Sequence, residues 1–362
     1  MKGVSGNLQL DAIVRVIDES SNTVIWYSDL SASDYAVYGL DDYGSIIILA
    51  TCNVTSGTSA FANVVPVDIT LPAGNTGVWS GGDYGGNEGY HNVMEMVNIN
   101  SLSNAFYFGD QSTKKKCYDS GTSNGANNRG VFPGGQTNQD TNDIQYINIS
   151  TGGDAITFGY LTTSFAFPGA CSNGTNNRGI VAGYNGIDYI TISTTGNASN
   201  FGNLVINRRH GTMLDNGTND RGVFGGGEDG GSFNSMDYIT ISTTSNAQDF
   251  GDLTTGSRWL TSCSNKTNNR GLFCMGSGAI LDYISINSVG NASDFGDLAA
   301  NATDAAATDN GVGNRGVFGW GAGYVVSNYK MHYINISSLG NSVDSGYNFF
   351  NQKYRSGACS NA

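Results

Sequence analysis

Apolar and polar residues alternate over short segments along most of the chain, and no long segment repeats its apolar residues at helical spacing. The segment 188–193, Asp-Tyr-Ile-Thr-Ile-Ser, is typical, and related segments begin at Tyr146, Tyr238, Tyr283 and Tyr333. A period of two is that of a half-buried β-strand, whereas an amphipathic helix has a period of 3.6. The pattern therefore predicts an all-β protein.

The alternating strand is one of four phrases that recur together. A strand of the form Asn-Arg-Gly-Val-Phe precedes it, a Phe-Gly-Asp-Leu phrase follows it, and an Ala-Cys-Ser-Asn phrase leads into the next unit. The glycines of the first phrase stand at 77, 130, 179, 222, 271 and 316, so the units are 43 to 53 residues long. Four short strands in a unit of this length are typical of a propeller blade.

The two ends of the repeat region complement each other. The segment 358–362, Ala-Cys-Ser-Asn-Ala, is a fourth phrase with no glycine strand after it, and the segment 75–79 is a glycine strand with no fourth phrase before it. We expect the last strand to complete the first blade, which closes a ring and removes exposed sheet edges. Residues 77–362 hold six units of the mean length, and this predicts a six-bladed β-propeller.

The first 72 residues follow a different pattern. Alternating segments at 12–18 and 23–27 predict one hairpin, segments at 35–40 and 45–50 predict a second, and 64–71 supplies a last strand. This arrangement resembles a small transthyretin-like or immunoglobulin-like β-sandwich. We therefore predict a sandwich domain at 1–72, a linker at 73–76 and the propeller at 77–362.

Composition excludes several classes of protein. Lys and Arg number 17 against 30 Asp and Glu, a net charge of −13, which does not suit a protein that binds the nucleic-acid backbone. The 52 glycines have no three-residue period, so the chain is not collagen, and 11% aromatic residues argue against disorder. No export signal is visible, and the strongest apolar run, 46–50, is too short to cross a membrane. We expect synthesis in a cytosol and no membrane insertion.

The residues that recur in every unit are interpreted as structural. An arginine in five of six units suits capping of carbonyls or pairing with Asp between blades better than a single anion site: Arg129, Arg178, Arg221, Arg270 and Arg315. Four cysteines are assigned to one position of the repeat: Cys117, Cys171, Cys263 and Cys359. Equivalent positions on different blades lie too far apart for a disulfide, so we expect buried thiols.

No catalytic or metal-binding constellation is found. His91, His210 and His332 lack metal-ligand spacing and are expected at the surface or in turns. The lysines at 114–116 predict a solvated turn or a contact between subunits. Glycine-rich loops are not followed by helices, so they lack the helix N-terminus that binds phosphate. We expect no cofactor, no metal and no enzyme; a glycan-cleaving propeller is a third, weaker hypothesis that would need paired carboxylates in one pocket.

The strand Gly-Val-Phe-Gly-Gly-Gly at 222–227, followed by a Tyr-containing strand, resembles the kelch-type β-propeller repeat. It departs from that repeat at 182–183 and 275–276, where the double glycine is incomplete, and no regular Trp closes each blade. The fuller phrasing, from Asn-Arg-Gly-Val-Phe-Gly-Gly-Gly to Asp-Phe-Gly-Asp-Leu, resembles repeats of virion structural proteins in large tailed, marine-type bacteriophages. This resemblance implies a tail-fibre, adhesin or capsid-decoration component.

The loop between the glycine strand and the Tyr strand varies sharply in length and content between units, and such loops are where binding usually resides. Aromatic residues there suit stacking on sugar rings: Tyr84, Tyr90, Tyr184, Trp320 and Tyr324. The leading hypothesis is a non-enzymatic virion protein that binds other virion proteins through its N-terminal domain, as a homo-oligomer on the particle. The alternative is a carbohydrate-binding adhesin, with a host-surface glycan as partner of the variable loops.

Overall fold

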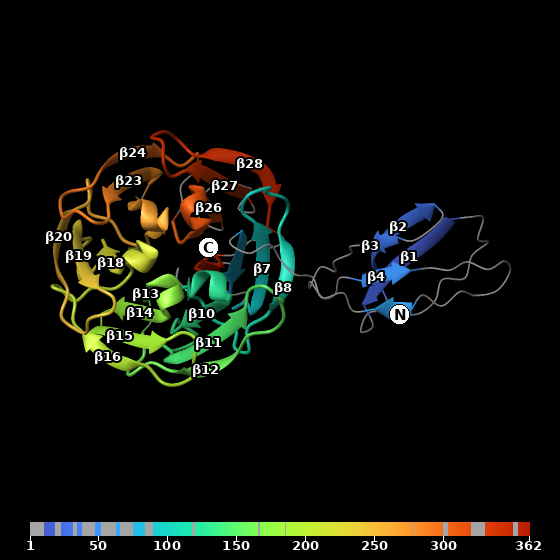
Figure 1. Cartoon of the computed structure of the whole chain (residues 1–362), viewed down its shortest axis with the longest axis horizontal. Helices are drawn as coiled ribbons and strands as arrows, with labels where there is room; N and C mark the ends of the chain where they lie inside the picture. Colours follow the sequence, from blue (N-terminus) through green and yellow to red (C-terminus); the bar gives the residue numbers. More distant parts are fainter. Residues whose placement is uncertain are drawn as a thin grey trace. The chain divides into compact units, whose positions relative to one another are not determined.

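The computed structural model describes residues 11–18, 23–31, 35–37, 48–51, 63–65, 75–83, 90–117, 120–165, 167–184, 186–276, 278–299, 303–319, 330–349 and 354–362 (Figure 1). The chain divides into two compact units, Met1–Thr70 and Leu71–Ala362. In the first unit the described residues form two small antiparallel sheets. One pairs β1 (Asp11–Asp18) with β2 (Thr23–Ser31), and the other contains β3 (Tyr35–Val37), β4 (Ile48–Thr51) and β5 (Asn63–Val65). Both predicted hairpins are present as strand pairings. The sandwich packing expected at 1–72 depends on side chains that the structure does not describe, so it stays a prediction.

The second unit is a six-bladed β-propeller, as predicted (Figure 1). Each blade is a four-stranded antiparallel sheet. Blade 1 contains β9 (Thr122–Ser123), β10 (Arg129–Pro133), β11 (Asp143–Asn148) and β12 (Ile156–Tyr160). Blade 2 contains β13 (Gly169–Ser172), β14 (Arg178–Gly183), β15 (Gly186–Thr191) and β16 (Ser199–Gly202). Blade 3 contains β17 (Thr212–Asp215), β18 (Arg221–Gly225), β19 (Ser235–Thr240) and β20 (Gln248–Asp252).

The remaining blades repeat this order and close the ring. Blade 4 contains β21 (Thr261–Ser264), β22 (Arg270–Cys274), β23 (Ile280–Ser285) and β24 (Ser293–Asp297). Blade 5 contains β25 (Ala306–Asp309), β26 (Arg315–Gly319), β27 (Lys330–Asn335) and β28 (Val343–Asn348). Blade 6 contains β29 (Gly357–Ser360), β6 (Thr76–Ser80), β7 (Val93–Asn98) and β8 (Phe106–Asp110). The C-terminal strand β29 pairs with β6, with Ala358 opposite Trp79 and Cys359 opposite Val78, so the predicted closure is confirmed.

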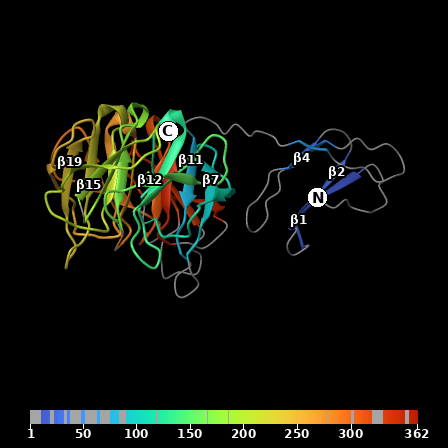
Figure 2. The ribbon, with the colours of Figure 1, turned by 90° about the horizontal axis from the view of Figure 1, so that it is seen from below.

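The first strand of each blade lies at the axis, and the fourth lies at the rim (Figures 1 and 2). Innermost strands of adjacent blades contact one another around the ring. In blades 1 to 5 a single 3₁₀ turn joins the first and second strands: η1 (Gly125–Asn127), η2 (Gly174–Asn176), η3 (Gly217–Asn219), η4 (Lys266–Asn268) and η5 (Gly311–Gly313). Each turn ends at an Asn or Asp in the left-handed region, a conformation that these side chains tolerate.

The third strand is less regular than its sequence suggests. In β15, Asp188 and Ile190 are buried and Thr191 is exposed, as alternation predicts, but Ile187 is also buried, next to a register shift between Ile187 and Asp188. Thr162, from the connection that precedes blade 2, donates its backbone N–H and its hydroxyl to the Asp188 carboxylate at 2.8–2.9 Å. Burial raises the pKa of Asp188, while these hydrogen bonds lower it. Thr254 and Asp282 repeat this contact between blades 3 and 4.

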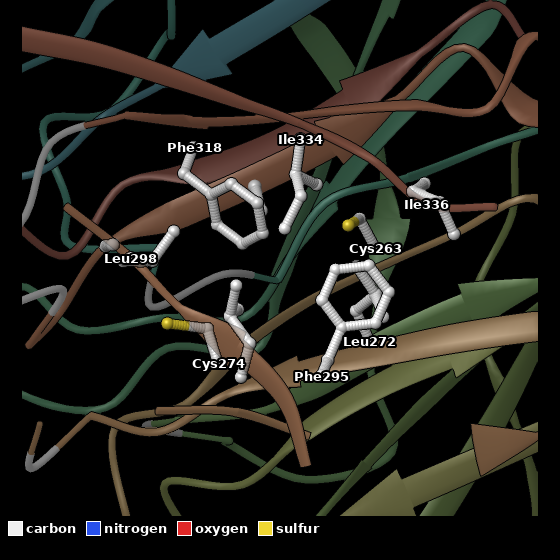
Figure 3. Packing of buried hydrophobic residues seen from close by; sticks show 11 residues of the cluster. Cys263, Leu272, Cys274, Phe295, Leu298, Phe318, Ile334 and Ile336 are labelled. Carbon is white, nitrogen blue, oxygen red and sulfur yellow. The ribbon is translucent and has the colours of Figure 1, made fainter. Parts of the chain in front are cut away.

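The core lies between blades. One cluster takes Cys263, Leu272, Cys274, Phe295 and Leu298 from blade 4 and Phe318, Ile334 and Ile336 from blade 5 (Figure 3). The repeated glycine of the second strand is where adjacent blades approach closely. A Cβ at Gly316 would lie 2.6 Å from Cys263 Sγ, and a Cβ at Gly130 would lie 2.6 Å from Cys359 Sγ. These glycines therefore leave room for the innermost strand of the preceding blade.

The cysteine assignment needs one correction. Cys171, Cys263 and Cys359 share a position on the innermost strand, but Thr122 occupies that position in blade 1. Cys117 lies outside that strand and packs against the Gln111 side chain. Residues 118–121 separate Cys117 from the innermost strand of blade 1, so the repeated phrase is shifted there relative to the strand. The five described cysteines are buried thiols, as expected.

Candidate functional site

The propeller has two faces with different connections. One face carries the 3₁₀ turns and the connections between the third and fourth strands, and we call it the turn face. The opposite face carries the variable connections between second and third strands and the connections from one blade to the next, and we call it the loop face. The element order places every repeated Arg on the turn face, and Tyr90 and Tyr184 on the loop face.

On the turn face, the repeated arginines join adjacent blades. Each guanidinium donates to the carbonyl that follows the third strand of the next blade, at 3.1–3.4 Å, and lies 4.5–5.1 Å from a tyrosine ring of its own blade. Arg315 closes the circle by donating to Ile99 in blade 6. Hydrogen bonds to charged groups and cation–π contacts both stabilise. These arginines are therefore occupied within the scaffold and do not form an anion site.

A second set of polar residues makes a closed circle of six hydrogen bonds on the same face. The Asn that follows each innermost strand donates its side-chain amide to an Asn or Asp of the following blade, at 2.6–3.1 Å; the donors are Asn124, Asn173, Asn216, Asn265, Asn310 and Asn361. In the first five of these Asn residues, the side-chain oxygen Oδ1 also accepts a hydrogen bond from the backbone N–H of the repeated arginine of its own blade. The Asn-rich turns thus tie the blades together.

A third circle joins the rim. A side-chain oxygen from the turn before each fourth strand accepts a backbone N–H of the preceding blade, at 2.9–3.1 Å. Asn197, which belongs to an Asn-x-Ser triplet, accepts from Tyr160 in this way, and Asn265, which belongs to an Asn-x-Thr triplet, is buried. The Asn of each triplet therefore forms a hydrogen bond between blades within the scaffold.

The axis contains a small polar cavity of about 50 Å³, lined by the innermost strands of all six blades. This volume suits a few water molecules rather than an organic ligand. Lys266 reaches Asp215 with Nζ–O distances of 3.1 and 3.2 Å, and Asp309 lies on the next blade. Lys266 stands at φ +49° where four other blades have glycine. Its nearby carboxylates raise the lysine pKa against the effect of burial, and burial raises the pKa of Asp309.

Two of the five aromatic residues expected to bind ligand lie among the described residues. Tyr184 is exposed at the end of β14, and Tyr90 is half-buried with Lys116 Nζ 5.2 Å from its ring centroid. Tyr84, Trp320 and Tyr324 lie outside the described residues. The two described residues lie on different blades, Tyr90 on blade 6 and Tyr184 on blade 2, and a shared ligand site for the five stays a prediction.

The loop face holds a group of residues that the sequence analysis did not identify. Each stands two residues before an innermost strand, where one blade leads into the next: Phe167, His210, Trp259, Asp304 and Arg355. We call this group the axial ring. Its backbones are joined, since Trp259 N–H donates to His210 O and Arg355 N–H donates to Asp304 O. The last four members have φ between +57° and +61°, a region that non-glycine residues seldom adopt.

One arc of the axial ring is aromatic. Phe167 and His210 stack with ring centroids 3.7 Å apart, and His210 meets Trp259 edge-on at 5.9 Å. Arg258 lies over the Trp259 ring at 4.1 Å and pairs with Glu228. Burial lowers the pKa of His210 to about 4, with help from nearby arginines and against the attraction of Glu228, so this imidazole is neutral at pH 7.

The other arc is ionic. Arg355 bridges two carboxylates, with Nε 3.2 Å from Asp304 Oδ2 and Nη1 3.0 Å from Asp83 Oδ2. Lys116 Nζ lies 2.8 Å from Asp83 Oδ2. Burial raises the pKa of Asp304, and Arg355 opposes that rise. The second oxygen of each carboxylate is buried and has no hydrogen-bond partner among the described residues.

Two expectations about charged residues were wrong. Lys115 is fully buried instead of solvated, because Asp143 Oδ2 at 3.1 Å and the Phe132 carbonyl at 3.3 Å accept from it. His91 and His210 lie in connections, as expected, although His91 is buried; His332 lies within β27, not at a turn. Within the described part of the chain, no three His, Cys, Asp or Glu side chains gather closely enough to hold a metal ion. Its helices include none long and apolar enough to cross a membrane.

Comparison with known proteins gives a fold and no family. Neither a protein-family model nor a curated protein matches the chain. Among solved structures, a chain from the crystal structure of a nidogen/laminin complex aligns with a TM-score of 0.53 and 8% identity. The alignment covers 78% of this chain and 97% of that one. At this identity the likeness concerns the propeller fold alone.

Proposed function

We propose that the protein is a non-enzymatic virion component of a tailed bacteriophage, as part of a tail fibre, an adhesin or the capsid decoration. The repeat phrasing supports the phage assignment. One structural observation favours display over catalysis: the polar residues that recur in the blades are engaged in bonds between blades. The loop face is where the blades differ, so it is the surface available for specific contacts.

In this proposal the protein is made in the host cytoplasm and assembles on the particle as a homo-oligomer. The N-terminal unit docks on other virion proteins, and the propeller presents its loop face for assembly contacts or host-surface recognition. A net charge of −13 suits neither nucleic-acid binding nor an anionic surface.

The test is a quantitative mass-spectrometric census of purified particles after washing at high salt. We expect the chain at a stoichiometry that is a simple multiple of a particle symmetry. A lysate of infected cells is the control for carry-over. Presence in the lysate together with absence from washed particles would refute the assignment.

A carbohydrate-binding adhesin is the second candidate, and the exposed Tyr184 on the loop face favours it. Here the variable-loop aromatics stack on a host glycan. A glycan array should then show binding by the full chain and loss of binding by Trp320→Ala or Tyr184→Ala. Silence across a broad array would count against this candidate without affecting the particle census.

A further inference from the structure

We propose that the axial ring on the loop face is a binding site for an uncharged saccharide, with the aromatic arc stacking on the sugar and the ionic arc hydrogen-bonding its hydroxyls. This inference takes its ligand class from the carbohydrate-binding alternative. It assigns the site to residues outside the variable loops and does not depend on a place in the virion.

The aromatic arc is held rigid before any ligand arrives. His210 is stacked between Phe167 and the edge of Trp259, and Arg258 holds the indole through its own pairing with Glu228. Phe167 and Trp259 are half-buried residues, whereas the His210 side chain is only 9% exposed and serves as the packed centre of the arc. Rigid aromatic groups lose little conformational entropy on binding, which favours their use as contact surfaces.

The ionic arc offers acceptors that the protein leaves unused. Asp83 and Asp304 are more than nine-tenths buried, and Oδ1 of each has no hydrogen-bond partner within the described chain. Both atoms are shielded from solvent, so a ligand hydroxyl reaches them only if neighbouring groups move aside on binding. A buried acceptor without a partner costs about 1–3 kcal/mol, and a hydroxyl that donates to it removes this cost. Arg355 has about a third of its side chain exposed and can donate to the same ligand.

The charges of the ionic arc select the kind of ligand. Asp83 and Asp304 face Arg355 and Lys116, so two negative and two positive groups balance one another. The arginine and the lysine would repel a free cation, and the carboxylates would repel a free anion. A ligand with hydroxyls, which both donate and accept, meets donors and acceptors side by side without a net charge penalty.

The backbone of the ring adds a further argument. His210, Trp259, Asp304 and Arg355 occupy a left-handed conformation that glycine adopts without cost, in a chain that has 52 glycines. The same chain places glycine in the left-handed region of four of its 3₁₀ turns. Retention of ionic and aromatic side chains at a strained position is typical of functional sites.

The test combines a glycan array with titration of the highest-scoring free saccharide into the full chain, measured by calorimetry. Trp259→Gly removes the indole and suits the local backbone, so it should fold as the wild type does. We expect this variant and Asp304→Asn each to weaken binding at least tenfold, the usual effect of losing a central contact. Tyr184→Ala, on the same face but outside the ring, is the matched control and should bind as the wild type does.

The outcomes separate the two carbohydrate hypotheses. If Trp259→Gly and Asp304→Asn bind normally while Trp320→Ala or Tyr184→Ala does not, the axial ring is overturned and the variable loops are the site. If the wild type binds no saccharide, both carbohydrate hypotheses are overturned and the particle census still decides the virion role. If Trp259→Gly fails to fold by circular dichroism, Asp304→Asn carries the test, and unchanged affinity in that variant contradicts the inference.

Discussion

The contact between Gly316 in β26 and Cys263 in β21 allows a precise test of how the blades pack. A Cβ at Gly316 would lie 2.6 Å from Cys263 Sγ and 3.3 Å from Ile334 Cγ2, within the cluster of Figure 3. The φ of Gly316 is outside the left-handed region, so alanine introduces a steric conflict and no backbone strain. Overpacking of this kind costs about 1–3 kcal/mol, and we expect Gly316→Ala to lower the free energy of unfolding by that amount.

A second substitution isolates the cause. Cys263→Ala removes the sulfur and by itself should cost about 1 kcal/mol. In the double variant the new methyl group fills the space that the sulfur leaves, so the combined loss should fall below the sum of the two by at least about 0.5 kcal/mol. Gly196→Ala is the control, because nothing lies within 4 Å of its Cβ position.

The assay is urea denaturation of the full chain, followed by far-UV circular dichroism and by tryptophan fluorescence. Trp79 is fully buried in the propeller and reports on its unfolding. Strictly additive effects of Gly316→Ala and Cys263→Ala, or a loss in Gly196→Ala as large as that in Gly316→Ala, would refute the explanation of the repeated glycine.

Three further predictions concern charged and polar groups. Arg270→Ala removes hydrogen bonds to Ile336 and Ser337 and should lower the unfolding free energy by about 1–3 kcal/mol in denaturation curves, whereas Lys114→Ala should not. Lys266→Gly relaxes the backbone but leaves Asp215 and Asp309 without their cation. Because burial raises the pKa of Asp309, this carboxyl protonates more readily in acid, so the variant should be destabilised at pH 7 and less so in acid; a pH-independent loss would contradict this. His210, whose pKa falls from 6.5 to about 4 in the fold, contributes stability that is complete above pH 6.5 and is lost as the pH falls towards 4, amounting to about 3 kcal/mol. His210→Asn, in the same surroundings of Glu228, Arg209, Arg258 and Arg355, should show a shallower decline over that range, and an equal slope would exclude the histidine as the cause.

The propeller could be predicted from sequence because its determinants are local and repeated. Alternation marked the third strands, and the incomplete phrases at 75–79 and 358–362 predicted the pairing of β6 with β29. The repeated Arg and Asn could be recognised as structural because a residue that recurs in most blades cannot serve one unique site. Their partners could not be predicted, since Arg129 reaches Ile192 in the next blade, and such contacts require the three-dimensional arrangement.

The axial ring escaped prediction for a different reason. Its members share a position in the repeat but not a residue type, so Phe167, His210 and Asp304 do not form a sequence motif. Alignment on the innermost strands would have placed them together, yet the displaced Cys117 obscured that alignment. Burial of Lys115 was likewise invisible, because its partner Asp143 lies in β11, three strands further along the chain.

Closure of the ring by β29 can be measured directly. Cys359 lies opposite Val78 and packs in the same buried cluster, so Val78→Cys places two thiols on adjacent strands. After mild oxidation and digestion, mass spectrometry should find a peptide that joins position 78 to Cys359 within a monomer. The absence of this cross-link, or its appearance only in dimers, would contradict a propeller closed by its C-terminal strand.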